Sequence, residues 1–353
     1  MLSLAVKYRP KTFDDVVEQK SIKLILNEQL KTGTHKNCYL FTGGAGTGKT
    51  TCARIFASQI NGFKGNPVEI DAASNNGVEN VRDIIDNAKF KALDAQYKVY
   101  IIDECHMLST GAWNAMLKLI EEPPAQTIFI FCTTDPQKIP ATILSRVQRY
   151  DFQRITHEAI VERLKYILQR ERWELFQGDG ADLGDPPNYD FEPEALEYIA
   201  KLVDGGMRDA ITLLDKCISY SSEVTLKNVI EALGTVNYND MFLLTEAIFE
   251  MQTANAIVLI EQIHRSGVDL KQFIKQYTYF VLDLCKYGLL NNFEYLQIPS
   301  IYYDKMKEYN ETAFAFFKVL LDSMIKLNAT IKWETAPKPL IEATIILLCQ
   351  EVE

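Results

Sequence analysis

The segment GGAGTGKT, residues 43–50, constrains the fold more than any other part of the sequence. It fits the pattern G-x-x-x-x-G-K-[ST], follows the apolar run CYLFTG (38–43) and opens the helical pattern GKTTCARIFASQI (48–60). This order predicts a phosphate-binding loop, because glycines let several backbone N–H groups point at one phosphate and the helix N-terminus adds a positive dipole end. A chance glycine-rich turn is the alternative.

The loop also predicts which residues hold the nucleotide and a magnesium ion. We expect Lys49 to reach the outer phosphates and the Thr50 hydroxyl to ligate Mg²⁺. The predicted nucleotide-binding residues of this segment are Gly43, Gly44, Ala45, Gly46, Thr47, Gly48, Lys49, Thr50 and Thr51.

Three further apolar runs are typical of strands: PVEIDA (67–72), KVYIIDE (98–104) and TIFIFCTT (127–134). They are apolar almost throughout, which predicts strands covered on both faces. Because they alternate with helix-length segments such as NVRDIIDNAKFKAL (80–93), we expect residues 1–150 to form an α/β domain with a parallel, doubly wound sheet.

Polar side chains end two of these strands. Asp103 and Glu104 leave a buried strand together, which is costly unless they meet a cation or a polar cleft. We expect Asp103 to hold Mg²⁺ through water and Glu104 to orient and deprotonate the attacking water; a solvated strand end is the alternative. His106 is expected to be a structural hydrogen-bonding residue. The C-terminal ends of neighbouring strands meet at one ligand-binding edge of such a sheet. We therefore expect the Thr134 hydroxyl to sense the γ-phosphate or to position the water. Capping of the local turn is the alternative.

From residue 151 the pattern becomes helical. Thr156 is a candidate N-cap for the helix that follows, and Gly205 and Gly206 break a later helical stretch in two. We place boundaries near residues 150 and 222, which gives a helical domain over 151–221 and a second one over 222–353, with turns near 234–240, 266–269 and 291–300. The segment 176–191 is rich in Gly, Asp and Pro and predicts a solvated acidic loop.

The composition is typical of a globular protein and argues against a membrane protein or a secreted one. Apolar residues make up 47% and charged residues 24% of the 353 residues, as in an ordinary globular protein. No apolar run reaches the roughly 18–20 residues of a membrane helix, and the start lacks a secretory pattern. The net charge of −10 argues against a surface coated with basic residues, although a local basic patch stays open. Seven scattered cysteines without a C-x-x-C pair predict reduced thiols in a cytoplasmic protein.

Six segments carry a more specific signal: KYRPKTFDDVVEQ (7–19), GGAGTGKTTCARIFA (43–57), EIDAASNNGVENVRDI (69–84), YIIDECHMLSTGAWNAMLKLIEEPP (100–124), TTDPQKIPATILSRVQRYDF (133–152) and GGMRDAITLLDK (205–216). Together they resemble the AAA+ clamp-loader ATPases, and among them the gamma/tau type of bacterial DNA polymerase III. The similarity covers the first 220 residues and continues more weakly through 263–274 and 337–348.

The resemblance implies an AAA+ P-loop NTPase domain, a helical lid and an all-α collar that oligomerises. It implies an ATPase subunit of a pentameric loader that opens a sliding clamp and places it on primer–template DNA. Its ATP hydrolysis should be stimulated by both the clamp and the DNA. The implied cofactors are ATP and Mg²⁺; the implied partners are the clamp, the DNA and other loader subunits, in a homo- or hetero-pentamer. Two rivals stay open: a non-hydrolysing scaffold subunit, and another AAA+ DNA motor of the branch-migration type.

By the same resemblance, two arginines act on the γ-phosphate. Arg146, in the SR motif, should act in trans as an arginine finger on a neighbouring subunit's ATP; a surface ion pair is the alternative. A guanidinium stabilises the charge spread over phosphoryl oxygens, and such a contact builds a ring or an open spiral. Arg208 matches the lid arginine that reaches the subunit's own nucleotide.

The resemblance also implies an adenine pocket and a DNA contact. Tyr8, Arg9 and Pro10 match the pocket segment, with Val16 and Val17 giving backbone contacts; core packing is the alternative for the two valines. Arg82, Lys89 and Lys91 match helices that face template phosphates and lie near the clamp; a solvated helix face is the alternative.

Three departures from the family pattern modify these expectations. Cellular members insert a four-cysteine zinc module after the phosphate-loop helix, whereas QINGFKGNPVEI (59–70) has no cysteine, so we expect no zinc. The acidic loop 176–191 is longer than the family's connection. The similarity ends by residue 353, so we expect no tau-type extension for helicase and polymerase.

Overall fold

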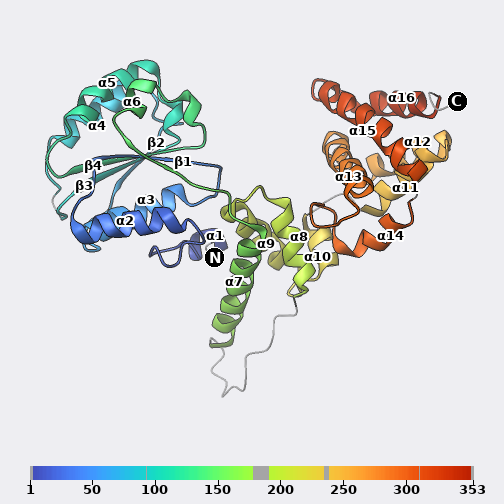
Figure 1. Ribbon diagram of the computed structural model, residues 1–353, viewed down its shortest axis with the longest axis horizontal. Coiled ribbons are helices and arrows are strands. Elements are labelled where there is room, and N and C mark those ends of the chain that lie inside the picture. The colour runs from blue at the N-terminus through green and yellow to red at the C-terminus, as the bar shows by residue number, and fades with distance from the viewer. Residues whose placement is uncertain (1–2, 93, 178–190, 234–237, 310, 351–353) are drawn as a thin grey trace. The chain divides into compact units, whose positions relative to one another are not determined.

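The chain has a first unit, residues 1–188 with 203–215, and a second unit, residues 189–202 with 216–353 (Figure 1). The computed structural model describes all residues except 1–2, 93, 178–190, 234–237, 310 and 351–353. Most of the predicted acidic loop 176–191 therefore lies outside the described residues. The finer division into domains at residues 150 and 221 stays a prediction.

The first unit contains a parallel five-stranded sheet in the order β2-β3-β4-β1-β5. The predicted α/β class is confirmed. The strands are β1 (Cys38–Thr42), β2 (Val68–Asp71), β3 (Lys98–Asp103), β4 (Thr127–Thr133) and β5 (Gln148–Asp151).

Helices cover both faces of this sheet (Figure 1). On one face, α2 (Lys20–Thr32) and α3 (Lys49–Ile60) enclose a buried core with Phe41 and Phe56. On the other, α4 (Val78–Ala88), α5 (Thr110–Glu121) and α6 (Ala141–Leu144) enclose a core with Trp113 and Phe131. Short helical turns complete the layers: α1 (Leu4–Lys7), η1 (Cys105–Met107) and η2 (Pro136–Lys138).

Two strands and one helix of this domain differ from what the sequence predicts. Strand β2 is not covered on both faces, because it forms the edge of the sheet and three of its four residues are exposed. Strand β5 was not predicted, since only Tyr150 among its four residues is buried. Helix α4 ends at Ala88, so Lys89 and Lys91 follow the helix instead of lying on it.

Two longer helices follow the sheet. Helix α7 (His157–Gln177) begins as predicted after Thr156, whose Oγ1 accepts a hydrogen bond from Ala159 N at 3.4 Å. Helix α9 (Met207–Tyr220) begins directly after the predicted Gly205–Gly206 break. Gly205 has φ +71°, and a Cβ there would lie 2.7 Å from the Arg154 Cβ, so glycine is required.

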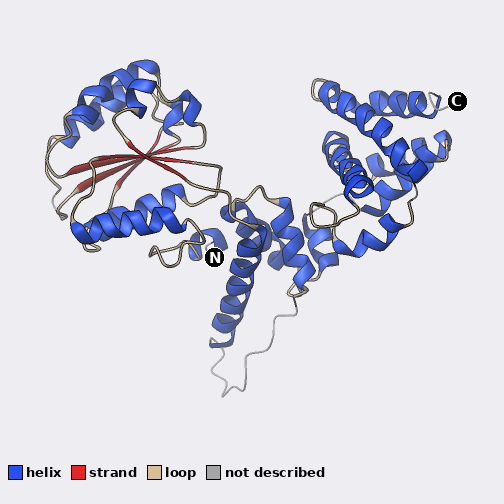
Figure 2. Ribbon diagram, viewed as in Figure 1, coloured by secondary structure: helices blue, strands red, loops and turns tan. Residues whose placement is uncertain are grey.

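Among the described residues, Figure 2 shows strands only in the first unit. The second unit is helical, as predicted, and its core is built largely on α13 (Leu270–Leu290) and α15 (Glu311–Ile331). Its other helices are α8 (Pro193–Leu202), α10 (Leu226–Leu233), α11 (Tyr238–Phe249), α12 (Thr253–Arg265), η3 (Ser300–Tyr302), α14 (Tyr303–Lys307) and α16 (Pro337–Gln350).

All seven cysteines are buried free thiols, which confirms the expectation of reduced cysteines. Burial raises the pKa of both Cys38 and Cys52 to about 12, so neither thiol is reactive at neutral pH. In the part of the chain that the structure describes, no helix has the length and apolar character to cross a membrane.

Candidate functional site

The phosphate loop connects β1 to α3, as predicted. Its backbone needs glycine at Gly43, Gly46 and Gly48, which have φ values of +146°, +69° and +103°. At Gly43 a side chain is also excluded by contact, because a Cβ would lie 2.5 Å from the Phe152 carbonyl oxygen. The loop is therefore fixed by its packing on the end of β5 as well as by its own sequence.

Lys49 lies at the start of α3 and is only 6% exposed. Its Nζ donates to the carbonyl oxygens of Gly43 at 2.9 Å and Gly44 at 2.7 Å. Burial lowers the pKa of Lys49, and the nearby charge of Glu104 opposes that shift. The carbonyl oxygens of the phosphate loop thus hold the Lys49 ammonium within reach of a ligand bound to that loop.

Thr50 and Asp103 meet across the ends of α3 and β3. The Thr50 Oγ1 donates to Asp103 Oδ2 at 2.9 Å. Hydroxyl and carboxylate oxygens are the hard donors that Mg²⁺ prefers, and Mg²⁺ sites in nucleotide enzymes use one or two such side chains beside the phosphates. The pair predicted from the sequence as metal ligands therefore lies together and has the right chemistry.

Glu104 directly follows β3 in the left-handed backbone region, with φ 45°. Non-glycine residues with such a φ are uncommon and cluster at functional sites. The Glu104 Oε2 accepts hydrogen bonds from the Thr134 N at 3.2 Å and the Thr134 Oγ1 at 3.0 Å. The predicted catalytic carboxylate and the predicted sensor hydroxyl are thus direct partners.

His106 and Thr133 support this pair. His106 Nδ1 lies 3.0 Å from the Thr133 Oγ1 and 3.2 Å from the Glu104 Oε2. The Thr133 hydroxyl also accepts a hydrogen bond from the Asp135 N at 3.0 Å. Turn capping was the alternative role for Thr134, and in the structure Thr133 makes this capping contact. The position of His106 agrees with a structural hydrogen-bonding role.

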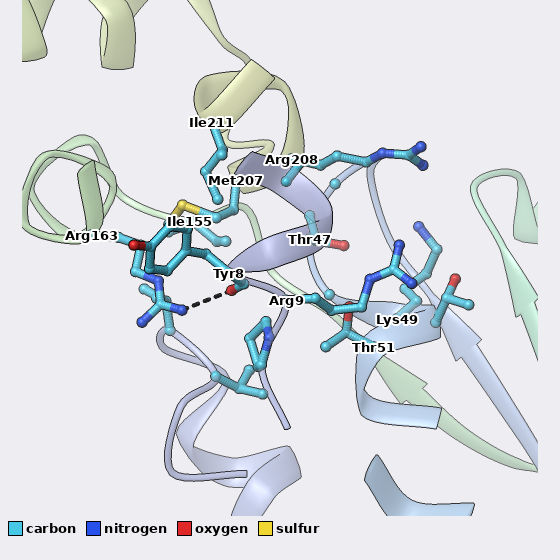
Figure 3. Close-up of a pocket in the computed structure, with 17 residues that line it drawn as sticks. Tyr8, Arg9, Thr47, Lys49, Thr51, Ile155, Arg163, Met207, Arg208 and Ile211 are labelled. Carbon is cyan, nitrogen blue, oxygen red and sulfur yellow. Dashed lines mark hydrogen bonds between the residues drawn. The ribbon is translucent and has the colours of Figure 1, made fainter. Parts of the chain in front are cut away.

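A pocket opens beside the phosphate loop (Figure 3). Its lining includes these predicted residues: Tyr8, Arg9, Pro10, Val16, Val17, Gly46, Thr47, Gly48, Lys49, Thr50, Thr51 and Arg208. The lining residues that sequence reasoning missed are Ala5, Ile155, Arg163, Met207 and Ile211. Four of these lie beyond residue 150, where the sequence pattern pointed to no nucleotide contact other than Arg208.

The phosphate loop contacts the start of α9 directly. Met207 N donates to the Gly46 carbonyl oxygen at 3.1 Å, and a Cβ on Gly46 would lie 3.0 Å from the Gly206 Cα. This close backbone contact places Arg208, in the first turn of α9, over the loop (Figure 3). The predicted lid arginine therefore lies on the chain's own pocket.

Arg146 does not line this pocket in the described structure. It follows α6, and its Nε donates to Glu121 Oε1 at 2.7 Å. Its Nη1 donates to the Thr142 carbonyl oxygen at 2.7 Å and the Ser145 Oγ at 3.0 Å. The side chain is 39% exposed, so the surface ion pair considered as its alternative role is present.

The predicted DNA-contact residues Arg82, Lys89 and Lys91 are all exposed. Lys89 pairs with Asp86 at 2.7 Å. The exposed face of α4 also carries the acidic residues Asp83 and Asp86, so this helix does not form a basic surface by itself.

Known proteins similar to this chain were found in three comparisons. Residues 66–156 match the family described as "DNA polymerase III, delta subunit", and residues 186–223 match "DNA polymerase III clamp loader subunit, ATPase lid domain". The DNA polymerase III subunit gamma of Buchnera aphidicola subsp. Acyrthosiphon pisum is 33% identical over 303 residues, 80% of each chain.

Longer relatives match as well. The DNA polymerase III subunit tau of Bacillus subtilis is 35% identical over 97% of this chain and 62% of its own length. The corresponding Escherichia coli subunit is 35% identical over 75% of this chain and 42% of its own length. The chain thus spans less than two-thirds of these relatives.

Among solved structures, the Thermotoga maritima RuvB Holliday junction branch migration motor has a TM-score of 0.51 and 20% identity. The match covers 86% of this chain and 99% of that one. At this identity the likeness concerns the fold alone, and it agrees with the predicted AAA+ architecture.

Proposed function

Because the chain belongs to the gamma/tau family of DNA polymerase III subunits, we propose that it is an ATP-hydrolysing subunit of a sliding-clamp loader. In this proposal it uses ATP binding and hydrolysis to open a clamp and place it on primer–template DNA. Its partners are the clamp, the DNA and the other subunits of a homo- or hetero-pentamer. The seven reduced thiols suit a cytoplasmic location.

The observation that carries the proposal is the set of contacts at the ends of β1, β3 and β4. The phosphate loop, the Thr50–Asp103 pair and the Glu104–Thr134 pair meet at one sheet edge. Each pair joins residues more than 25 positions apart in the sequence, so their meeting is not a consequence of local sequence. ATP hydrolysis requires these groups: phosphate donors, oxygen ligands for Mg²⁺, and a base beside the attacking water.

In the proposed reaction, Lys49 exchanges the Gly43 and Gly44 carbonyl oxygens for the oxygens of the outer phosphates. Thr50 and Asp103 would hold Mg²⁺, which would offset the charge on the phosphate oxygens. Glu104 orients the attacking water and accepts its proton, while Thr134 fixes the position of that carboxylate. The Thr50–Asp103 and Thr134–Glu104 hydrogen bonds are already present in the structure, whereas Lys49 gives up its carbonyl partners to reach the phosphates.

Arg146 completes the reaction centre from a neighbouring subunit. Its part-exposed position after α6, where it contacts Glu121 and Thr142, is consistent with an action in trans. A guanidinium supplied in this way is worth about 10³-fold or more in rate, and it makes hydrolysis depend on assembly. The helical residues 222–353 are proposed to form the collar that holds subunits side by side, and residues 151–221 the lid.

Arg208 connects nucleotide binding to the position of the lid. It lies in the first turn of α9, which contacts Gly46 of the phosphate loop through Met207. A triphosphate that contacts both Arg208 and the loop favours the closed arrangement, which is a shift of population driven by differential contacts. Arg82, Lys89 and Lys91 would add to a DNA-binding channel only by summation over several subunits.

Clamp- and DNA-stimulated ATP turnover tests the proposal. The parent chain, assembled with its partner subunits, is expected to hydrolyse ATP faster when clamp and primed DNA are added together. The Lys49→Ala variant should lose that turnover, because a phosphate-binding cation is missing. Equal turnover of both chains would favour the non-hydrolysing scaffold, and turnover that needs DNA but no clamp would favour a branch-migration type of motor.

A further inference from the structure

The pocket beside the phosphate loop has two chemically different ends. One end is apolar and includes the Tyr8 ring, Ile155, Met207 and Ile211 (Figure 3). The other end carries cationic groups, Lys49 and Arg208 among them. An adenine base suits the first end and a triphosphate the second, because a flat apolar ring and a polyanion need opposite surroundings.

The Arg9 side chain extends toward the cationic end. In Figure 3 its guanidinium points toward Lys49 and Arg208 and away from the Tyr8 ring. Its sequence neighbour Tyr8 belongs to the apolar end, where the Tyr8 carbonyl oxygen accepts a hydrogen bond from Arg163 Nη2 at 3.0 Å. The two adjacent residues therefore serve opposite ends of one pocket.

Arg9 has no anion of its own within the described residues. No hydrogen bond or ion pair of its guanidinium to an acceptor occurs there, although the side chain is half-buried. The nearby carboxylate Glu69 is in an ion pair with Arg54. Burial lowers the pKa of Arg9, the charges of Arg54 and Arg208 lower it further, and Glu69 opposes only part of this shift. A half-buried guanidinium among like charges is stabilised by a bound anion.

We propose that Arg9 binds the phosphates of the nucleotide, as a further cation beside Lys49 and Arg208, and that it does not contact the adenine. This inference rests on the proposed ATP site. A guanidinium offers several donors in a fixed plane, so it can bridge two phosphate oxygens while Lys49 acts as a point charge. Tyr8 and Pro10, on either side of Arg9, keep their predicted place near the base.

The test compares a nucleotide with a base-free polyphosphate. Binding of AMP-PNP and of inorganic tripolyphosphate, each with Mg²⁺, is measured on the purified parent, Arg9→Gln, Arg9→Lys and Arg265→Gln chains. We expect Arg9→Gln to weaken both probes by the same factor, about tenfold to a hundredfold, the value of a charge-assisted hydrogen bond. Arg9→Lys should recover part of the loss, because it keeps the charge.

Arg265→Gln is the matched control. Arg265 is an exposed arginine of α12 paired with Glu261, so its loss removes the same charge far along the chain and should leave both affinities unchanged. Thermal unfolding of all four chains shows whether each is folded. Parent-like affinity of Arg9→Gln for both probes would overturn the inference, and so would a loss confined to AMP-PNP, which would assign Arg9 to the base. A parent chain that binds neither probe would instead contradict the proposed function.

Discussion

The guanidinium of Arg146 is oriented by its own chain through Glu121, with the Nε 2.7 Å from the Oε1 carboxylate oxygen. Glu121 is the last residue of α5, and Arg146 follows the short helix α6. Nη1 donates to Thr142 and Ser145. Of the three guanidinium nitrogens of Arg146, only Nη2 therefore has no hydrogen bond to the described residues. The proposed finger is therefore held with one terminal nitrogen available for a phosphate.

This relationship predicts that Glu121 orients the finger. The Glu121→Gln variant keeps a hydrogen-bond acceptor but loses the charge, and half-exposed pairs of this kind are worth about 0.5–1 kcal/mol. We expect turnover in the assembled loader to fall about two- to fivefold, with no change in ATP affinity. A variant that turns over faster than the parent would mean that Glu121 restrains Arg146 instead of orienting it.

The contact between Glu104 and Thr134 predicts separate effects on binding and on chemistry. Glu104→Gln removes the base and keeps an oxygen that can accept from Thr134, so ATP affinity should stay within about twofold of the parent. Turnover should drop by about 10²- to 10⁴-fold, the contribution of a positioned general base. Equilibrium binding and steady-state hydrolysis on the same preparation measure the two quantities; equal losses in both would assign Glu104 to nucleotide binding.

Gly43 and Gly33 form a matched pair for the packing of the phosphate loop. Both have positive φ, but a Cβ at Gly33 meets nothing within 4 Å, whereas one at Gly43 lies 2.5 Å from the Phe152 oxygen. Gly33→Ala should cost about 1–2 kcal/mol of unfolding free energy from backbone strain alone. Gly43→Ala should cost more and also weaken ATP binding, as measured by urea unfolding and nucleotide titration. Equal unfolding costs would show that the contact with Phe152 relaxes freely.

Asp283 in the helical second unit predicts a pH effect on stability. It is 3% exposed and accepts from the backbone N–H groups of Gln297 at 2.7 Å and Ile298 at 3.0 Å. Burial raises the pKa of Asp283 above 3.8, and Lys286 with these N–H groups opposes only part of that shift. A raised pKa means that the folded chain binds this proton more tightly than the unfolded chain, so the carboxylate costs stability as the pH rises above 3.8.

The Asp283→Asn variant keeps an acceptor oxygen and does not titrate. Its stability relative to the parent should therefore improve as the pH is raised from about 4 to about 7, as measured by urea unfolding at each pH. Asp283→Ala should be less stable than Asp283→Asn at every pH, because it leaves the buried Ile298 N–H and the part-buried Gln297 N–H without this acceptor. A difference between the Asn variant and the parent that does not change with pH would contradict the raised pKa.

Features of the fold and the site that depend on a few adjacent residues could be predicted from the sequence, whereas features that depend on long-range contacts could not. The loop 43–50, the strand ends at Asp103 and Thr134 and the break at Gly205 each follow from a few adjacent residues, and the structure places them as expected. Strand β5 was missed, because an edge strand with one buried residue has no apolar run to mark it.

The lining of the pocket shows the limit of local patterns. Arg163 and Ile155 reach it only because α7 and the segment before it pack beside the N-terminal residues, a long-range contact that periodicity cannot reveal. Similarly, the resemblance assigned Arg9 to the adenine pocket together with Tyr8 and Pro10, yet its long side chain extends toward Lys49 and Arg208. Neither the left-handed backbone of Glu104 nor the Glu121–Arg146 pair has a signal in the sequence.

The most direct test of the central claim, a reaction centre divided between two subunits, is the Arg146→Ala variant in the assembled loader with clamp and primed DNA. ATP affinity and ATP turnover are measured on the same assembly. We expect unchanged ATP affinity, because the proposed finger acts on a neighbouring subunit's nucleotide, and turnover lower by about 10³-fold or more. Turnover equal to that of the parent would contradict it.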